Sequence, residues 1–327
     1  MKKSSWALCA VLAAALGFVG CGKSQAPEAA KPQKLRIGVS VPAVTHGWTG
    51  GIVWYVQKAE KEIEAANPDV DVIIAMGEDT TKQVDQIENL TARGIDALVV
   101  VCQEPGPITP AVKEAKEKGA YVVIVSNPMS EPVQDVFVNG DNRSLGEEAA
   151  RAMGKLLGGK GDILIIEGIP NPINTDRVEG FRSILAKEFP EIKILDSQTG
   201  MWNAEKSMAV MENFLQKYDH VDGVWAGDDD NILGAIKAYE GSGRSDVKAM
   251  VGGGGSKIVI KKVLDDDSII KATVTYSPKM AYIGVQKALE GLRNGKKPVN
   301  DEKELIIRSE IVLKENADKF YEPDAVY

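Results

Sequence analysis

Short apolar runs alternate with amphipathic stretches of helical length from residue 35 to near the end of the chain. Runs such as 35–41, 97–101 and 121–125 lack polar alternation, which is typical of strands covered on both faces of their sheet. Regular alternation of such strands with helices predicts right-handed crossovers and parallel sheets. About ten strands are too many for one modest sheet. We therefore predict an α/β fold of two doubly wound parallel-sheet lobes.

The remaining strands are expected at 71–75, 163–166, 193–195, 223–226, 249–251 and 271–275. The helices are expected at 50–65, 82–93, 110–118, 145–157, 177–187, 204–216, 232–239, 257–264 and 280–293. Open parallel sheets bind ligands beyond the carboxyl ends of their strands. If the two lobes face each other, one cleft is therefore lined by the loops 42–48, 102–107, 126–129, 168–177, 227–231, 252–256 and 276–278.

The first residues have the pattern of a targeting segment rather than of a folded element. Lys2 and Lys3 precede an apolar run of about 14 residues, shorter than the roughly 20 that a membrane-spanning helix needs. This predicts an export signal over 1–20. Its end, Phe-Val-Gly-Cys21, resembles a bacterial lipoprotein box, in which cleavage leaves Cys21 as a lipidated N-terminus. Plain cleavage nearby is the alternative. Residues 21–34 are expected to be a flexible tether.

Composition excludes several functional classes. The chain has 47 acidic and 39 basic residues and a net charge of -8, so the basic footprint of a nucleic-acid-binding protein is missing. Cys102 is the one cysteine beyond the targeting segment, and His46 and His220 are the only histidines. We therefore expect no metal, no cofactor and no catalysis. His46 and Cys102 could suggest a thiol protease, but no asparagine or aspartate that would orient the histidine is identifiable.

Two tryptophans stand at the ends of predicted elements. Trp48 comes after the first strand and Trp202 precedes a helix that Asn203 is placed to cap. An indole offers a flat face on which a sugar ring stacks, although a tryptophan in the core or between lobes is the alternative at both positions. Trp54 lies within a predicted helix and Trp225 within a buried strand, so core packing is expected for both.

The polar candidates lie in the same loops. Asp228, Asp229 and Asp230 precede a helix, where acids stabilise the N-terminus, and a carboxylate also accepts paired hydrogen bonds from sugar hydroxyls. A calcium loop is excluded because its sixth and twelfth positions hold Leu233 and Tyr239. Arg177 follows Asn174-Thr175-Asp176, at a predicted helix start where its charge opposes the helix dipole. The run Gly252–Gly255 allows a close backbone approach or an anion site, or it is a tight turn.

Several segments together carry a family resemblance. They are 79–83 with 87–88, 94–100, Gly140-Asp141-Asn142 with Gly146, Arg177 with Glu179-Gly180-Phe181, and 272–274 before Pro278. Over 35–327 the chain resembles the type I periplasmic solute-binding proteins of the ribose- and galactose-binding branch. The resemblance implies three chain crossings, near 139–141, 275–277 and 302–307. It places the first lobe at 35–139 with 277–303 and the second at 140–276 with 304–327.

The resemblance also implies ligand contacts. Trp48 and Trp202 stand where the family has aromatics, Arg177 matches its ligand-binding arginine, Ser126 and Asn127 match a contacting pair, and Asp228 matches a contacting asparagine. Tyr276 falls where glutamine or asparagine is usual, and Gly253–Gly255 replaces the usual Phe-Asp-Gly. The ligand-binding candidates are therefore His46, Trp48, Ser126, Asn127, Asn174, Arg177, Trp202, Asp228 and Tyr276.

These implications favour a monomeric, lipid-anchored binding protein of the bacterial cell envelope. It would capture a sugar, polyol or sugar-like solute for the permease of an ATP-binding-cassette (ABC) importer. A sensory receptor that presents the solute to a chemoreceptor or kinase is the first alternative, and an envelope carbohydrate-active enzyme is the second.

Overall fold

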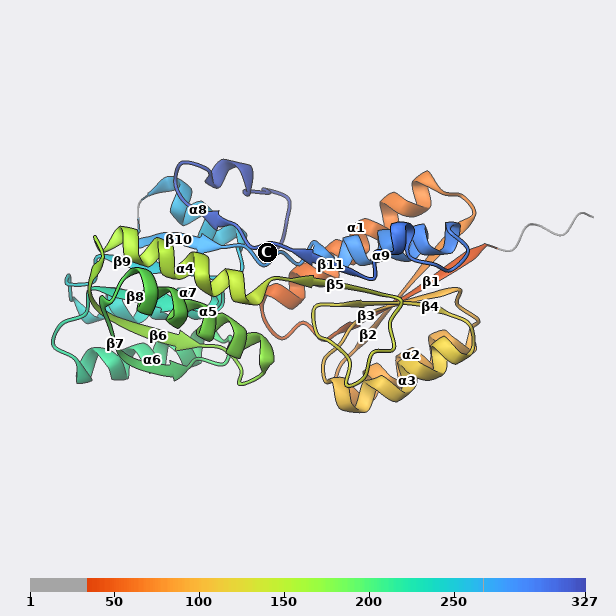
Figure 1. Ribbon diagram of the computed structural model, residues 1–327, viewed down its shortest axis with the longest axis horizontal. Coiled ribbons are helices and arrows are strands. Elements are labelled where there is room, and N and C mark those ends of the chain that lie inside the picture. The colour runs from red at the N-terminus through yellow and green to blue at the C-terminus, as the bar shows by residue number, and fades with distance from the viewer. Residues whose placement is uncertain (1–33, 267) are drawn as a thin grey trace, which may run out of the picture. The chain divides into compact units, whose positions relative to one another are not determined.

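A computed structural model describes residues 34–266 and 268–327, and two six-stranded sheets organise them (Figure 1). The expected signal over 1–20, Cys21 and the tether up to residue 33 lie outside the described residues. Within the described part of the chain, no helix is both long and apolar enough to cross a membrane.

The first lobe is built on a parallel sheet with helices on both faces. Its strand order is β11-β5-β4-β3-β1-β2. The strands are β1 (Leu35–Pro42), β2 (Val70–Gly77), β3 (Ala97–Val101), β4 (Tyr121–Val125), β5 (Val136–Gly140) and β11 (Glu304–Ile307). Helices cover both faces of this sheet, as Figure 1 shows. They are α1 (Gly47–Ala66) with α9 (Met280–Arg293), and α2 (Thr80–Ala92) with α3 (Pro105–Glu117).

The continuous apolar strands follow from this double cover. On β3, Val99 packs into the core under α1 and α9, whereas Leu98 and Val100 pack into a separate core under α2 and α3. All three side chains are fully buried. A strand whose two faces are both buried has no position for a polar side chain, because successive residues point to opposite faces.

The second lobe repeats the design in the order β12-β10-β9-β8-β6-β7. Its strands are β6 (Lys160–Glu167), β7 (Glu191–Thr199), β8 (Gly223–Ala226), β9 (Ala249–Val251), β10 (Ile270–Val274) and β12 (Ile311–Val312). Its helices are α4 (Asn142–Leu156), α5 (Pro172–Glu188), α6 (Ala204–Lys217), α7 (Asp229–Ser242) and α8 (Lys257–Asp265). Trp225 is fully buried and stacks on Phe181 at 3.9 Å, which confirms its expected place in the core.

Two late strands depart from the expected pattern. The lobe boundaries stay a prediction, but β11, expected in the second lobe, pairs in parallel with β5 in the first sheet. It therefore runs toward the second lobe, and the chain enters the second sheet from the carboxyl end of β10. For that reason β12 pairs antiparallel with β10, through Thr273 opposite Val312. The second sheet is thus parallel except at this edge.

The connections between the two sheets lie side by side. The backbone N–H of Asp141 donates to Ile307 O at 3.0 Å, which joins the segment after β5 to the end of β11. The N–H of Thr275 donates to Glu310 O at 2.9 Å, and the N–H of Glu310 returns to the Thr275 hydroxyl at 2.9 Å. Three crossing segments paired in this way hold the carboxyl edges of both sheets at one place.

Glycine lets α4 and α5 pack unusually close. A Cβ on Gly146 would collide with the backbone oxygen of Arg177, and one on Gly180 would collide with that of Arg143. The two helices are therefore in direct backbone contact. This contact fixes the position of α5 and, with it, the position of Arg177.

We predict that Gly146→Ala lowers the free energy of unfolding by about 1–3 kcal/mol or more, because overpacking usually costs that much. Urea denaturation measures it. Gly241→Ala on α7 is the matched control: a Cβ there would have nothing within 4 Å. It should leave stability unchanged or raise it by up to about 1 kcal/mol, because alanine favours helix. Equal stabilities of the two variants would contradict this description of the α4–α5 contact.

Candidate functional site

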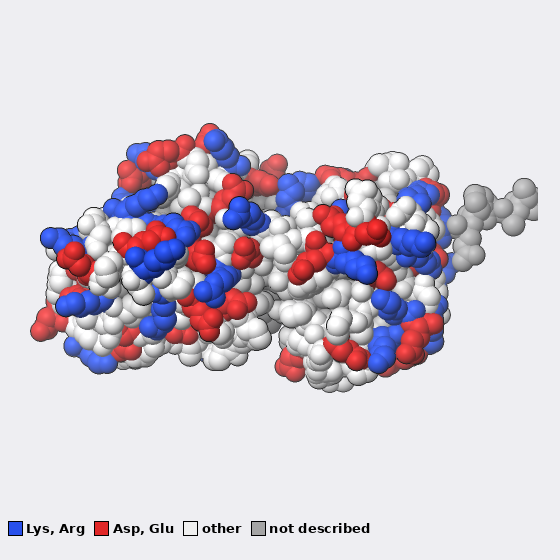
Figure 2. All heavy atoms as spheres, in the orientation of Figure 1, with Lys and Arg blue, Asp and Glu red and all other residues white. Residues whose placement is uncertain are grey.

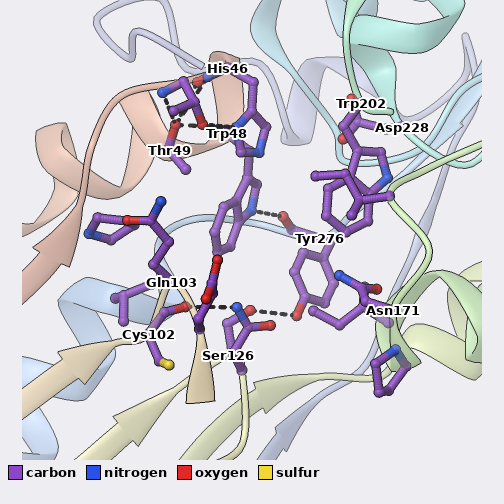
Figure 3. A pocket seen from close by; sticks show the side chains of 18 of the residues that line it. His46, Trp48, Thr49, Cys102, Gln103, Ser126, Asn171, Trp202, Asp228 and Tyr276 are labelled. Carbon is purple, nitrogen blue, oxygen red and sulfur yellow. Dashed lines mark hydrogen bonds between the residues drawn. The ribbon is translucent and has the colours of Figure 1, made fainter. Parts of the chain in front are cut away.

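A cavity of about 490 Å³ lies where the carboxyl ends of the two sheets meet (Figure 3). Its volume is within the range of small-molecule sites. Both lobes line it, and the lining includes eight of the nine ligand-binding candidates: His46, Trp48, Ser126, Asn127, Arg177, Trp202, Asp228 and Tyr276. The strand-end rule therefore located the cavity correctly.

Aromatic rings form its walls. Figure 3 shows Trp48 on one side of the pocket and Trp202 on the other, with Tyr276 between them. The Trp48 indole N–H donates to Tyr276 O at 2.9 Å, so this ring is fixed to the crossing segment. The Tyr276 hydroxyl is within 2.9 Å of the Ser126 hydroxyl, and Ser126 adopts a left-handed φ of 68°. These contacts leave flat apolar faces toward the cavity.

Trp202 is held by strained backbone. Met201 and Trp202 have φ values of 58° and 52°, in the left-handed region that residues other than glycine rarely occupy. The indole lies against Gly168, where a Cβ would overlap its ring nitrogen. That nitrogen is buried and has no hydrogen-bond partner among the described residues. Backbone strain of this kind accumulates where a side chain must be held in one functional position.

Arg177 lies deeper than the sequence indicated. The helix α5 begins at Pro172 with Asn171 as its cap, so Arg177 is inside the helix rather than at its start. Only 4% of the residue is exposed. Its Nε donates to Asn142 Oδ1 at 3.0 Å and its Nη1 to Gly227 O at 2.7 Å. The guanidinium also lies 4.6 Å from the centre of the Tyr276 ring. Arg177 lines the cavity while two of its nitrogens are already bonded to protein.

Asp228 meets the cavity from the second lobe. It is 5% exposed, and its Oδ1 accepts from the Asp230 N–H at 2.9 Å as the cap of α7. The pKa of Asp228 is raised to about 7, mainly by burial and also by the charge of Asp230, while Arg177 opposes the shift. The neighbouring Asp229 faces away, toward Ser256 and Thr273, and burial raises its pKa as well. Asp228 thus both caps α7 and lines the cavity, whereas Asp229 and Asp230 do not line it.

The loop before α1 touches the second lobe. The Gly47 N–H, at the start of α1, donates to Asp230 Oδ2 at 2.9 Å, so an acid of one lobe caps a helix of the other. The His46 ring lies between the tryptophans, with centroids 6.4 Å from Trp48 and 6.3 Å from Trp202. Burial lowers the pKa of His46 below its usual value.

One candidate does not line the cavity. Asn174 uses its amide within the second lobe: its Oδ1 accepts from the Gly168 N–H at 2.7 Å and its Nδ2 donates to Glu167 at 3.0 Å. These two bonds hold the Asn174 side chain at the end of β6 and away from the cavity. Asn127 does line the cavity, and its Nδ2 donates to Cys102 O at 2.8 Å.

Sequence reasoning missed five polar residues of the lining: Thr45, Thr49, Gln103, Glu104 and Asn171. Gln103 is the most informative, because its side-chain oxygen is buried without a partner among the described residues. Its position after β3 was the available signal. In the described part of the chain, no group of three acidic, histidine or cysteine side chains is arranged to hold a metal ion.

Comparison with known proteins decides the family. A model of the periplasmic binding protein domain matches residues 37–297. The chain belongs to that family. This confirms the resemblance to the type I branch that binds ribose and related sugars. The lobes and cavity above are therefore those of a periplasmic binding protein.

Three similar proteins show the breadth of this family. A xylitol-binding protein of Mycolicibacterium smegmatis is 30% identical over 74% of this chain and 67% of its own length. The ribose import binding protein of Bacillus subtilis is 27% identical over 91% and 95%. The solved structure of an ABC transporter solute binding protein from Bacillus halodurans with bound myo-inositol is 25% identical. It has a TM-score of 0.77 and covers 89% of this chain and 98% of that one.

The raised pKa of Asp228 predicts a specific pH dependence of stability in this periplasmic binding protein. Between the ordinary pKa of 3.8 and the folded value of about 7, the folded state keeps a proton that the unfolded state has lost. Stability from this group therefore falls as pH rises through that window, by at most about 1.4 kcal/mol per pH unit. Asp228→Asn removes the effect, so its stability relative to wild type should increase from pH 5 to pH 8 in urea titrations.

Asp246→Asn is the control of opposite sign. The Arg244 hydrogen bond holds the pKa of Asp246 at about 2, so its contribution is complete above pH 4. The stability difference of this variant should be constant from pH 5 to pH 8. A constant difference for Asp228→Asn as well would show that Asp228 titrates normally.

Proposed function

We propose that this protein captures a sugar or polyol between its lobes and delivers it to the permease of an ABC importer. One observation carries the proposal: Arg177 and Asp228 meet a cavity of about 490 Å³ whose walls are Trp48, Trp202 and Tyr276. Flat aromatic faces suit the C–H faces of a polyol or sugar ring, and a carboxylate with a guanidinium suits its hydroxyls. The xylitol, ribose and myo-inositol bound by similar proteins support the same ligand class.

Binding in this form requires no reaction at the ligand. The ligand touches both lobes only when they are closed, so it shifts the balance between open and closed forms. The closed form is the signal that a permease reads. We propose an extracytoplasmic location and a monomeric state for the same protein, in keeping with its family.

A thermal-shift and calorimetry panel of xylitol, D-ribose, D-allose and myo-inositol tests the function. A ligand present at about 100 times its Kd stabilises the folded state by about 2.7 kcal/mol, which raises the melting temperature. Trp202→Ala should weaken the best ligand about tenfold, since aromatic contacts contribute about 0.5–1.5 kcal/mol beyond area burial. Tryptophan fluorescence should change on binding in the wild type and much less in this variant.

Trp54→Phe is the matched control, because Trp54 packs against Tyr55 on α1 and does not line the cavity. Its affinity should equal that of the wild type. Arg177→Ala is less informative, since its bonds to Asn142 and Gly227 make it destabilising without ligand as well. Failure of every sugar and polyol to raise the melting temperature would overturn the proposed ligand class.

We also propose that Cys21 anchors the protein to the membrane through lipid. The pattern of residues 1–21 supports this proposal. A single myristoyl-like chain binds membranes marginally, whereas several chains on one residue hold firmly. Cys21→Ser should therefore release the protein into the soluble fraction after cell disruption, measured by fractionation and immunoblotting. Retention of the variant in membranes would exclude this anchor.

A further inference from the structure

Three glycines that the proposed function leaves unexplained surround one side chain. Gly47 and Gly51 lie one turn apart on α1 of the first lobe, and Gly254 lies between β9 and α8 of the second. The side chain is that of Tyr327, which is 8% exposed. Within the run Gly252–Gly255, the close approach at Gly254 is an approach to Tyr327.

The glycines form a slot that fits the ring. A Cβ on Gly47 would lie 3.0 Å from Tyr327 Cδ2, and one on Gly51 would lie 2.9 Å from Tyr327 Cβ. A Cβ on Gly254 would overlap the Tyr327 hydroxyl, and the φ of 119° at Gly254 is suited to glycine. The tyrosine thus extends from the first lobe to the second.

The segment before Tyr327 contacts both lobes as well. The Tyr55 hydroxyl on α1 donates to Glu322 at 3.1 Å. The Lys257 ammonium at the start of α8 donates to Pro323 O at 3.2 Å. Residues 322–327 therefore form a fourth link between the lobes, beside the three crossing segments. We call these residues the strap.

Tyr327 acts through its shape. Its hydroxyl is buried and has no hydrogen-bond partner among the described residues. The ring lines a second cavity of about 300 Å³ beside the crossing segments, and Gly254 and Tyr276 line both this cavity and the ligand cavity. The strap residue therefore stands directly behind the wall of the ligand site.

We propose that Tyr327 is a positioning residue that sets the closed spacing of the two lobes. The slot accepts the ring at one spacing only, and at that spacing Asp228 of the second lobe faces Trp48 of the first across the cavity. The Gly47 hydrogen bond to Asp230 lies at the same slot, because both Asp230 oxygens are 3.2 Å from the Cβ that Gly47 lacks. This proposal rests on the proposed function, in which ligand binds the closed form.

The test compares Tyr327→Ala with Tyr327→Phe, using the ligand that the sugar and polyol panel identifies. Tyr327→Ala should weaken binding about tenfold, mainly through faster dissociation, because the closed form loses its spacing. Its ligand-induced decrease in radius of gyration should also be smaller. Tyr327→Phe should bind as the wild type does, since the ring is retained and the hydroxyl has no partner. Wild-type affinity in Tyr327→Ala, or a loss in Tyr327→Phe equal to it, overturns the proposal.

Filling the slot from the other side gives an independent test. Gly47→Ala should weaken binding about fivefold, because its new methyl group meets the ring. The same change made in Tyr327→Ala should cost less, because only the contact with the Asp230 carboxylate remains, so the double-mutant cycle should show coupling. Gly50→Ala is the matched control on α1, since a Cβ there would meet only Val44, at 3.6 Å. An additive cycle overturns the proposal.

The failure of the proposed function would give a different result. If the wild type binds no member of the panel, the proposed function fails. Thermal unfolding without ligand then decides the role of Tyr327, measured on the wild type, Gly47→Ala, Tyr327→Ala and the double variant. Gly47→Ala should then lower the melting temperature more when Tyr327 is present than in Tyr327→Ala. No decrease, or the same decrease on both backgrounds, overturns the proposal.

Discussion

The hydrogen bonds between the crossing segments are the constraint on which the rest of the structure depends. Asp141 bonded to Ile307, and Thr275 bonded to Glu310, hold three passages of chain together. Each sheet therefore presents its carboxyl edge at the same place, where helix N-termini and strand-end loops leave polar groups for a ligand. Few dihedral angles need to change for the lobes to move relative to one another, because only short segments connect them.

The binding groups are built into the fold rather than placed upon it. Arg177 binds Asn142 and Gly227 before any ligand arrives, and Trp48 is bonded to the crossing segment at Tyr276. Pre-bonded side chains lose little conformational freedom on binding, which favours affinity. The same arrangement makes these residues contribute to stability, so that ligand contact and fold cannot be separated by truncating them.

The charged side chains away from the cleft are of both signs and interspersed on the face seen in Figure 2.

Much of the fold was predictable because it is written in local pattern. The strands at 97–101, 121–125, 223–226 and 249–251 have the residues expected, since an apolar run between turn residues fixes its own ends. The strands β5, β11 and β12 were missed. β5 ends in an asparagine and a glycine, β11 alternates exposed and half-buried positions, and β12 has only two residues, so their identity comes from the partner strand rather than from their own residues.

The site was predictable to the level of the loop and not of the atom. The strand-end rule selected the loops that contain Trp48, Arg177 and Asp228, whereas the roles of Asn174 and Gln103 depend on where an amide points. The Asn174 amide is held by Gly168 and Glu167, and the Gln103 oxygen is buried without a partner among the described residues, neither of which a local pattern specifies. Tyr327 was invisible for a further reason: its partners at Gly47 and Gly254 are distant in sequence, and tertiary structure alone brings them together.

The late strands determine the order in which the molecule can be completed. The first sheet lacks its edge until Glu304–Ile307 pairs with β5, and the second lacks its edge until Ile311–Val312 pairs with β10. Neither lobe can therefore finish as an independent folding unit while the chain is being made. Contacts so distant in sequence slow folding, and an uncovered strand edge invites pairing with other chains. The edges of β5 and β10 consequently stay open to pairing with other chains until β11 and β12 have been made.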